Sequence, residues 1–309
     1  MRILAIVNPR SRAGATARRW PGVEAKLRQA LGPLEVEATR GPRDAERIAR
    51  EGVRAGVELV VVAGGDGTLS ETAAGLLGAG LGRYAEIAPL PLGTGGDFVR
   101  GLGLSGDLDA AIARIAAGKV HRIDAGRIAF HDRRGQPATT HFVNIASAGV
   151  SGLVTELVNR APKALGGRLS FLIGTLRAIA RWQAAPVRIR VDGTVVHEGP
   201  LDLAAVANGS HFGGGMRVAP AARPDDGLFD VISIRGTSRA RLLRHLPLLY
   251  DGRHLSLPDV ASHRGVHVEI EPLRSDTEVC IEVDGEPLGR LPARFELLPG
   301  ALALRGLPP

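Results

Sequence analysis

The glycine-rich segment Gly64-Gly65-Asp66-Gly67-Thr68 is the part of this sequence best suited to chemistry. It follows an apolar run at 57–63 and precedes residues with helical spacing from Leu69 onward. A loop between a strand and a helix N-terminus points several backbone N–H groups at one spot, and the helix dipole adds positive potential there. Glycines also let the backbone come close to a bound group. The segment therefore predicts a phosphate-binding loop, although not a Walker A loop, because no Gly-Lys-Thr follows.

Two further loops are expected at the same place in the fold. Leu92-Gly93-Thr94-Gly95-Gly96-Asp97-Phe98 follows the next predicted strand, and Asn8-Pro9 follows the first one. In open parallel sheets, ligands bind at the carboxyl ends of the strands. Three loops at one edge, with the carboxylates of Asp66 and Asp97, predict a nucleotide site there.

Plainer interpretations of the same residues stay open. Each loop is also compatible with an ordinary tight turn. Thr68 and Glu71 have the spacing of a helix capping box, and Asp97 has the place of an N-cap for a helix that begins at Phe98.

The elements that must position these loops follow from the spacing of apolar residues. Predicted strands alternate with predicted helices through the first third of the chain. The strands are 3–7, 36–38, 57–63 and 87–92, and the helices are 17–31, 44–55, 69–77 and 108–117. This alternation predicts an α/β domain with a mostly parallel sheet that is covered on both faces.

The pattern changes near residue 125. Helical patterns become rare, at 166–182 and 238–250, and strand-like segments follow one another. These segments are 124–129, 141–146, 187–191, 201–207, 228–234, 266–271 and 279–283. They predict a β-rich, largely antiparallel C-terminal domain.

The composition narrows the class of protein. A chain of 309 residues is long enough for two domains. Its single cysteine, Cys280, excludes an intramolecular disulfide and suits a reducing compartment. No apolar run reaches the roughly 20 residues that span a bilayer, so we expect a cytoplasmic protein. The net charge of +7 favours anionic partners, but only 4% of the residues are aromatic and no nucleic-acid-binding motif is present, so we expect no nucleic-acid partner.

The three loops, taken in order, resemble those of the diacylglycerol kinase catalytic domain family. The best match is its bacterial branch of YegS-like lipid kinases, which are relatives of the sphingosine kinases. The resemblance runs from Asn8 to about Leu304. Its later landmarks are Asn208-Gly209-x-x-x-Gly213-Gly214-Gly215, Asp225-Asp226-Gly227-Leu228-Phe229-Asp230, Asp284-Gly285-Glu286 and Leu298-Pro299-Gly300-Ala301. A Gly-Gly-Asp-Gly-Thr run alone also resembles NAD kinases, whereas the ordered set resembles the lipid kinases.

The resemblance implies a role for each matching position. Asp97, with Asp66, would position a catalytic Mg²⁺ through water, and Glu286 would accept the proton of the substrate hydroxyl. Asp226, with the backbone carbonyls of Arg223 and Leu228, would hold a second, structural Mg²⁺. The residues expected at ATP are Asn8, Pro9, Thr39, Gly64, Gly65, Asp66, Gly67, Thr68, Glu71, Gly93 and Thr94.

Several of these positions have a simpler interpretation, and one departs from the family. Asp284-Gly285 is typical of a hairpin turn, which would make Glu286 a solvated turn residue. Asp225-Asp226-Gly227 is also typical of a turn. Gly96 stands where the family usually has Asn, so the loop lacks an amide that would orient Asp97.

The resemblance also implies a domain organisation and a reaction. We expect a nucleotide-binding domain at 1–125 with a return segment at 295–309, a lipid-substrate domain at 126–294, and a nucleotide cleft between them. The expected activity is transfer of the γ-phosphate of ATP to the hydroxyl of diacylglycerol, phosphatidylglycerol or a sphingoid-like lipid. The alternatives are an NAD kinase-like enzyme with a soluble substrate, and a nucleotide or lipid sensor without catalysis.

The amphipathic segment 168–182 bears on where such an enzyme would work. Its apolar stripe fits either core packing or a membrane surface. Together with the positive charge, it is compatible with peripheral binding to the inner face of an anionic membrane. The sequence does not fix the oligomeric state, and a homodimer is one of the states considered.

Overall fold

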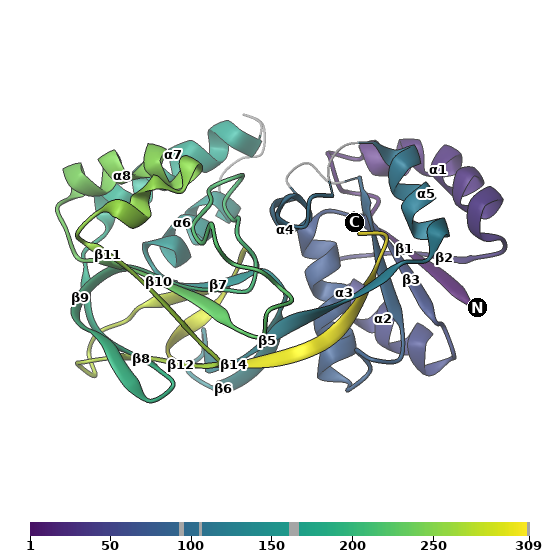
Figure 1. Cartoon of the computed structure of the whole chain (residues 1–309). Helices are drawn as coiled ribbons and strands as arrows, with labels where there is room; N and C mark the ends of the chain where they lie inside the picture. The colour runs from purple at the N-terminus through teal and green to yellow at the C-terminus, as the bar shows by residue number, and fades with distance from the viewer. Residues whose placement is uncertain (93–95, 105–106, 161–166, 308–309) are drawn as a thin grey trace. The chain divides into compact units, whose positions relative to one another are not determined.

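The computed structural model describes residues 1–92, 96–104, 107–160 and 167–307, and it describes no side chains at 159, 160 and 167–172. The chain divides into two compact units, drawn in Figure 1. Unit 1 consists of Met1–Ala125 and Pro299–Pro309, and unit 2 is Gly126–Leu298.

The sheet of unit 1 consists of parallel strands. They are β1 (Ile3–Val7), β2 (Glu35–Ala38), β3 (Leu59–Gly64), β4 (Glu86–Pro91) and the last part of β14 (Glu286–Arg305). The strands pair in the order β14–β4–β3–β1–β2. Every residue of β3 is buried, which explains why this strand is apolar without alternation.

Helices cover both faces of this sheet. They are α1 (Ala15–Leu31), α2 (Asp44–Arg54), α3 (Asp66–Gly78) and α5 (Leu108–Ala117), with the single-turn α4 (Asp97–Gly101) between β4 and α5. Trp20 and Leu27 of α1 and Ile115 of α5 pack with Ala5 and Val61 on one face. Helices α2 and α3 pack together on the other face (Figure 1).

Unit 2 is rich in antiparallel strands, as predicted for the C-terminal part of the chain. Its strands, besides β14, are β5 (Val120–Asp132), β6 (Pro137–Phe142), β7 (Ile145–Gly149), β8 (Ala185–Val191), β9 (Thr194–Ala207), β10 (Phe229–Arg235), β11 (Val260–Gly265), β12 (His267–Pro272) and β13 (Cys280–Val283). Their pairings close on themselves in the order β9–β7–β13–β14–β12–β8 and back to β9. Each strand therefore has one face toward the inside of this circuit and one toward the outside.

The two faces of β9 belong to different cores. Ala204 and Val206 lie in the inner cluster, whereas Leu203 and Ala205 lie in a second cluster with the helices of unit 2. These helices are α6 (Val150–Arg160), α7 (Gly167–Arg181) and α8 (Arg239–Asp251), followed by the short 3₁₀ helix η2 (Arg253–Ser256). Figure 1 shows α7 and α8 side by side. Among the described residues, no helix is long and apolar enough to cross a bilayer.

One predicted element is wrong, and some elements were not predicted. The strand expected at 141–146 is two strands, because β6 ends at Phe142 and β7 begins at Ile145. The backbone N–H groups of Val143 and Asn144 between them donate to the Asp284 carboxylate, at 3.0 Å each, instead of continuing a ladder. The elements without a prediction were α6, β11, β14 and η2.

Gly75→Ala tests the close packing of α2 on α3. A Cβ at Gly75 would lie 2.6 Å from the Glu46 Cα, so the two helices would have to separate. We expect a loss of about 1–3 kcal/mol in the free energy of unfolding, measured by urea denaturation. The matched control is Gly22→Ala in α1, where nothing lies within 4 Å of the new Cβ, and where alanine should gain up to about 1 kcal/mol. Equal effects of the two substitutions would contradict the packing argument.

Candidate functional site

The first glycine-rich loop joins the end of β3 to the start of α3. Gly65 is extended, with φ −98° and ψ −173°, and the helix begins at Asp66. A Cβ at Gly64 would lie 2.6 Å from the Thr68 Cβ and would also meet its Oγ1, so the chain needs glycine there. The first backbone N–H groups of a helix point out of its N-terminus, and here the N–H of Thr68 donates to the Gly65 carbonyl at 3.0 Å, in a tightened first turn. The loop is therefore a ready acceptor for an anion.

Asn8 connects this loop to the end of β1. Its Nδ2 donates to the Oγ1 of Thr68 at 3.1 Å, and its Oδ1 accepts the N–H of Arg10 at 3.0 Å. Thr68 is 4% exposed. The predicted capping box is wrong, because the N-cap is Gly65 and Thr68 lies within the first turn. Its hydroxyl fixes the Asn8-Pro9 loop instead.

Asp66 connects the first glycine-rich loop to the second. Its Oδ2 accepts the N–H of Asp97 and, at 3.3 Å, the N–H of Phe98. Asp97 is the first residue of α4 and not its N-cap, so the predicted cap is wrong; the N-cap is Gly96, in the left-handed region at φ 30°. The carboxylate of Asp97 pairs with Arg100 at 2.6 Å. Gly93 and Thr94, predicted to contact ATP, lie outside the described residues.

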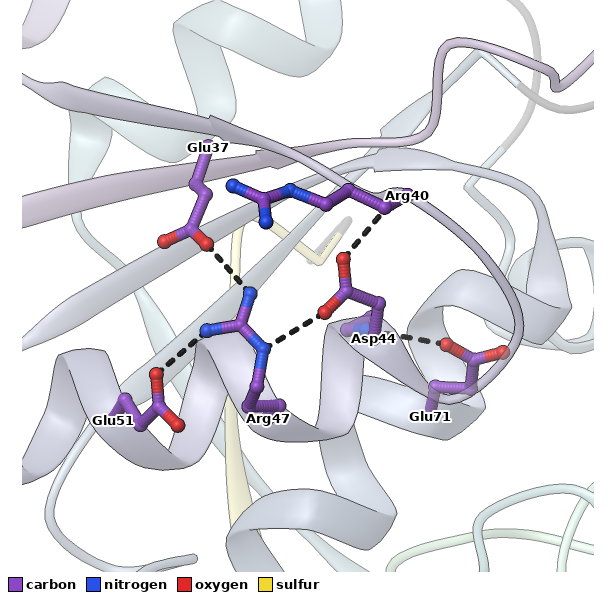
Figure 2. Close-up of polar contacts among 7 residues, drawn as sticks. Glu37, Arg40, Asp44, Arg47, Glu51 and Glu71 are labelled. Atoms are coloured by element: carbon purple, nitrogen blue, oxygen red, sulfur yellow. Dashed lines mark hydrogen bonds and ion pairs between the residues drawn. The ribbon is translucent and has the colours of Figure 1, made fainter.

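Glu71 supports the loop that carries Thr39. Its Oε2 accepts the N–H of Ala45, at the N-terminus of α2, at 3.3 Å (Figure 2). Burial raises the pKa of this carboxyl, and its hydrogen bonds to the backbone act in the opposite direction. The N–H of Thr39 donates to Val7 at 2.8 Å, which holds this loop beside the end of β1. Glu71 is one of the predicted ATP contacts, and in this structure its carboxylate holds the N-terminus of α2.

A charged network holds the same loop from the other side. Arg47 of α2 pairs with Glu37 at 2.8 Å, with Asp44 at 2.9 Å and with Glu51 at 2.6 Å (Figure 2). Asp44 also accepts the N–H of Arg40 at 2.8 Å. These contacts connect β2 to α2 across the turn between them. The pairs are exposed, so we assign them to the geometry of the loop and not to stability.

The carboxylates at this edge suit a hard cation. Mg²⁺ prefers carboxylate oxygens and water, and the hydrogen bond from the backbone N–H of Asp97 to the Asp66 carboxylate brings these two acidic residues together. A phosphate at the N-terminus of α3 would otherwise face these negative charges. The donor set therefore fits the predicted magnesium ion at Asp97 and Asp66.

In unit 2, Glu286 is held by a tight turn. Asp284 and Gly285 have φ values of 47° and 86°, and Val283 pairs with Glu286 across the turn, as the hairpin signature predicts. The Asp284 carboxylate accepts the N–H groups of Val143, Asn144 and Ile145, each at 3.0 Å. Glu286 is exposed at the first position of β14. The turn is thus anchored, and its glutamate faces solvent.

At the second predicted metal position, the Arg264 guanidinium supplies a positive charge. The Asp226 carboxylate pairs with Arg264 and also accepts the N–H of Leu228 at 3.2 Å. The guanidinium lies 3.5 Å from the buried Asp230, which is the register partner of Arg264 between β10 and β11. Arg223 pairs through its side chain with Asp225 at 3.3 Å. An arginine therefore neutralises Asp226 in this structure, as Arg100 neutralises Asp97, and the second magnesium ion stays a prediction.

Glu282 is a buried acid near the turn that was not predicted as a site residue. It belongs to β13 and is 4% exposed. Its Oε1 accepts from Ser147 and its Oε2 from Thr155, at 3.1 Å each. Burial, with the charges of Asp284 and Glu286, raises its pKa to about 7. The sequence signal is an acid between the apolar residues 281 and 283.

Comparisons with known proteins agree with this geometry. Residues 2–128 match the diacylglycerol kinase catalytic domain, and residues 144–306 match the YegS C-terminal NAD kinase beta sandwich-like domain. A diacylglycerol kinase of Mycobacterium tuberculosis is 32% identical over 305 residues, which is 97% of this chain and 94% of that protein. The chain belongs to the diacylglycerol kinase family of lipid kinases. The predicted family is confirmed.

Other members of the diacylglycerol kinase family extend the comparison. A probable YegS-like lipid kinase of Chromohalobacter salexigens is 32% identical over 90% of this chain and 86% of its own length. A crystal structure from Bacillus anthracis, provisionally assigned as a diacylglycerol kinase, has a TM-score of 0.79 and 27% identity over 100% of this chain and 95% of that one. Yeast NADH kinase, with a TM-score of 0.55 and 14% identity over 99% of this chain and 82% of that one, shares the fold.

Arg264→Gln tests the arginine at the second predicted metal position. Loss of the cation beside Asp226 and the buried Asp230 should cost about 1–3 kcal/mol of unfolding free energy. We expect Arg264→Gln to regain part of its loss in Mg²⁺ but not in EDTA, by more than Mg²⁺ changes the thermal midpoint of the wild type. The control is Arg223→Gln, whose side chain is 70% exposed and should matter little. Equal responses of Arg264→Gln and of the wild type to Mg²⁺ would contradict the idea that the Arg264 guanidinium stands in the place of a cation.

Proposed function

We propose that this chain transfers the γ-phosphate of ATP to the hydroxyl group of a lipid. The observation that carries the proposal is the linkage of the loops after β1, β3 and β4 through Asn8–Thr68 and Asp66–Asp97. Such a linkage gives a phosphate-binding loop and two carboxylates at the edge where parallel sheets bind ligands. Membership of the diacylglycerol kinase family supports the lipid as acceptor.

ATP would be held by the residues around the N-terminus of α3. The backbone N–H groups from Gly65 to Thr68 would receive its phosphates. Asn8 and Thr39, at the ends of β1 and β2, would lie along the nucleotide, with Pro9 shaping the first loop. Thr94, from the second loop, would complete the set. Glu71 would act indirectly, by holding the N-terminus of α2 and with it the Thr39 loop.

Asp97, with Asp66 behind it, would hold a magnesium ion through water. When bound, this ion neutralises phosphate charge and makes the γ-phosphate a better acceptor. Arg100 now neutralises Asp97, so the pair between them would loosen when the cation binds. Asp66 would keep its place, because it is held by the backbone of α4.

Glu286 would act as the general base. The lipid hydroxyl oxygen forms the new bond to the γ-phosphorus, its proton passes to the Glu286 carboxylate, and the bond from phosphorus to the β-phosphate oxygen breaks to release ADP. The anchored Asp284-Gly285 turn would fix the carboxylate for this transfer. Such an assignment requires Glu286 and the nucleotide loops to meet at one cleft, which stays a prediction, as do the nucleotide and lipid roles of the two domains.

The lipid is expected to be reached at a membrane surface. Leu176 of α7 is 44% exposed, and Leu243 and Tyr250 of α8 are 40% and 47% exposed. Exposed Arg177, Arg181 and Arg244 accompany them on the same two helices. Apolar side chains among arginines suit the interface of an anionic bilayer. We infer that the exposed faces of α7 and α8, together the α7–α8 face, dock the enzyme on the membrane that contains its substrate.

Transfer of labelled γ-phosphate in mixed micelles with Mg²⁺ tests the reaction. The lipid panel would contain diacylglycerol, phosphatidylglycerol and a sphingoid base. We expect one of them to be labelled by the wild type, with a loss of about 10²–10⁴-fold in Glu286→Gln, because a general base contributes that much. Asp97→Asn should lose activity similarly, whereas Glu278→Gln, at an exposed carboxylate on the same hairpin, should not.

Each result of this assay has a separate meaning. Label on a lipid with Glu286→Gln fully active would keep the lipid kinase and exclude the proposed base. Label on no lipid, with NAD phosphorylated instead, would favour the NAD kinase-like alternative. Binding of ATP without any product would favour a sensor.

Sedimentation with phosphatidylglycerol-containing vesicles tests the α7–α8 face. Reversing Arg177, Arg181 and Arg244 to Glu should cut retention by at least tenfold, because each basic residue near an anionic surface contributes about 1 kcal/mol. The matched control reverses the exposed Arg19, Arg54 and Arg83 of unit 1, which lowers the net charge by the same amount. Equal loss in both variants would mean that overall charge, and not this face, drives binding.

A further inference from the structure

Glu282 lies on the outer side of β13, beneath helix α6. Its neighbours in the strand, Ile281 and Val283, belong to the inner core of unit 2, so the carboxyl has the opposite direction. Helix α6 covers that side closely, because a Cβ at Gly152 would lie 2.8 Å from the Cβ of Cys280. The acid therefore sits at a helix–strand contact where an apolar side chain would be the ordinary choice.

Two hydroxyl groups contact this carboxyl. Thr155 of α6 donates to one of its oxygens at 3.1 Å, and Ser147 of β7 lies 3.1 Å from the other. Ser147 is also 2.7 Å from Ser151 of α6. Because a hydroxyl has one proton, a Ser147 that donates to Ser151 accepts the proton of the neutral Glu282. Glu282 is thus the point at which strand β13 is hydrogen-bonded by side chains to both β7 and α6.

The same strand leads directly into the turn of the proposed base. Asp284 and Glu286 follow Glu282 by two and four residues. Asp284 fixes the turn to residues 143–145, and Glu282 fixes the strand before it. Because Glu282 and Asp284 are both fixed by hydrogen bonds, the turn that follows them restricts where Glu286 can move.

Charge also couples Glu282 to this turn. The charged and titratable groups around the strand are Glu156 on α6, Glu278 just before β13, Cys280 at its start, Asp284 in the turn, Glu286 and Arg290 on β14, and Arg133 after β5. Burial is the main reason that the pKa of Glu282 is about 7, and the charges of Asp284 and Glu286 add to it. Glu282 is therefore a neutral acid in mildly acidic solution and becomes an anion as the pH rises past neutrality.

We propose that Glu282 is a positioning residue for the phosphoryl transfer: as a neutral acid it holds the Glu286 turn against α6 and β7, and as an anion it weakens the reaction. The proposal rests on the proposed function, because it acts through Glu286. An added anion beside the turn opposes the arrival of the charged γ-phosphate at the base. A buried anion also favours entry of water between α6 and β13.

The pH dependence of kcat tests this role, with labelled ATP, Mg²⁺ and diacylglycerol in mixed micelles. We expect the wild-type kcat to fall severalfold between pH 6 and pH 8.5, with a midpoint near the pKa of about 7. Glu282→Gln keeps the shape and cannot ionise, so its kcat should be flat over this range. Thr155→Val removes a hydrogen bond that favours the anion, so the fall should move to higher pH. KM for ATP should be unchanged in both variants.

Thermal unfolding gives a second measurement that does not depend on activity. The folded pKa of Glu282 lies above its ordinary value of 4.5, so the folded protein holds a proton that the unfolded chain loses. Stability should therefore fall as the pH rises from about 4.5 to about 7, and Glu282→Gln should lack this part of the fall. Glu278→Gln, at an exposed position, is the control for both measurements.

The outcomes separate this inference from the proposed function. An active wild type whose pH profile is unchanged by Glu282→Gln would overturn the role of Glu282 alone. A Glu282→Gln variant that loses kcat equally at every pH and has a lower thermal midpoint would show that Glu282 only stabilises the fold. That result would also overturn the proposed positioning role. A wild type that labels no lipid would overturn the proposed function and this role with it.

Discussion

The hydrogen bonds from the Asp97 and Phe98 amides to the Asp66 carboxylate join two loops that no strand pairing connects. Parallel strands bring the ends of β1, β3 and β4 to one edge of the sheet, but they do not fix the loops beyond those ends. Asp66 fixes the second loop, and the bond from Asn8 to Thr68 fixes the first strand's loop to the same helix. The geometry of the proposed phosphate site thus depends on side chains that form hydrogen bonds with the backbone and with one another.

Unit 2 uses the same device with a different result. Asp284 accepts three consecutive backbone N–H groups, which breaks the strand after Phe142 and holds the turn before Glu286. A carboxylate that accepts several N–H groups is stabilised as an anion and is rigid. In both units, then, an aspartate beside the proposed chemistry is structural, and the neighbouring acid is left for the reaction. In each unit, one acidic residue fixes the backbone, and another is available for the proposed reaction.

The sequence was most informative where structure is local. Strand 3–7 and helix 108–117 were predicted to the residue, because buried parallel strands are continuously apolar and helices repeat at short spacing. Contacts between distant segments were not predictable. Nothing local marks Arg264 as the partner of Asp226, or Glu71 as the acceptor for α2. Glu282 alternates with the apolar residues 281 and 283, as a solvent-facing residue of a strand would. It is buried because helix α6, which was not predicted, covers it.

The last strand has a consequence for how the protein is made. Ala303 and Leu304 of β14 pair with Glu86 and Ile87 of β4, so the sheet of unit 1 is completed by residues near the end of the chain. The whole of unit 2 is synthesised between these two strands. At translation rates of about 5–20 residues per second, the edge of β4 waits on the order of 10–40 s for its partner. A nascent chain therefore exposes an unpaired apolar strand throughout the synthesis of its second unit, and this edge is open to pairing with other strands until β14 arrives.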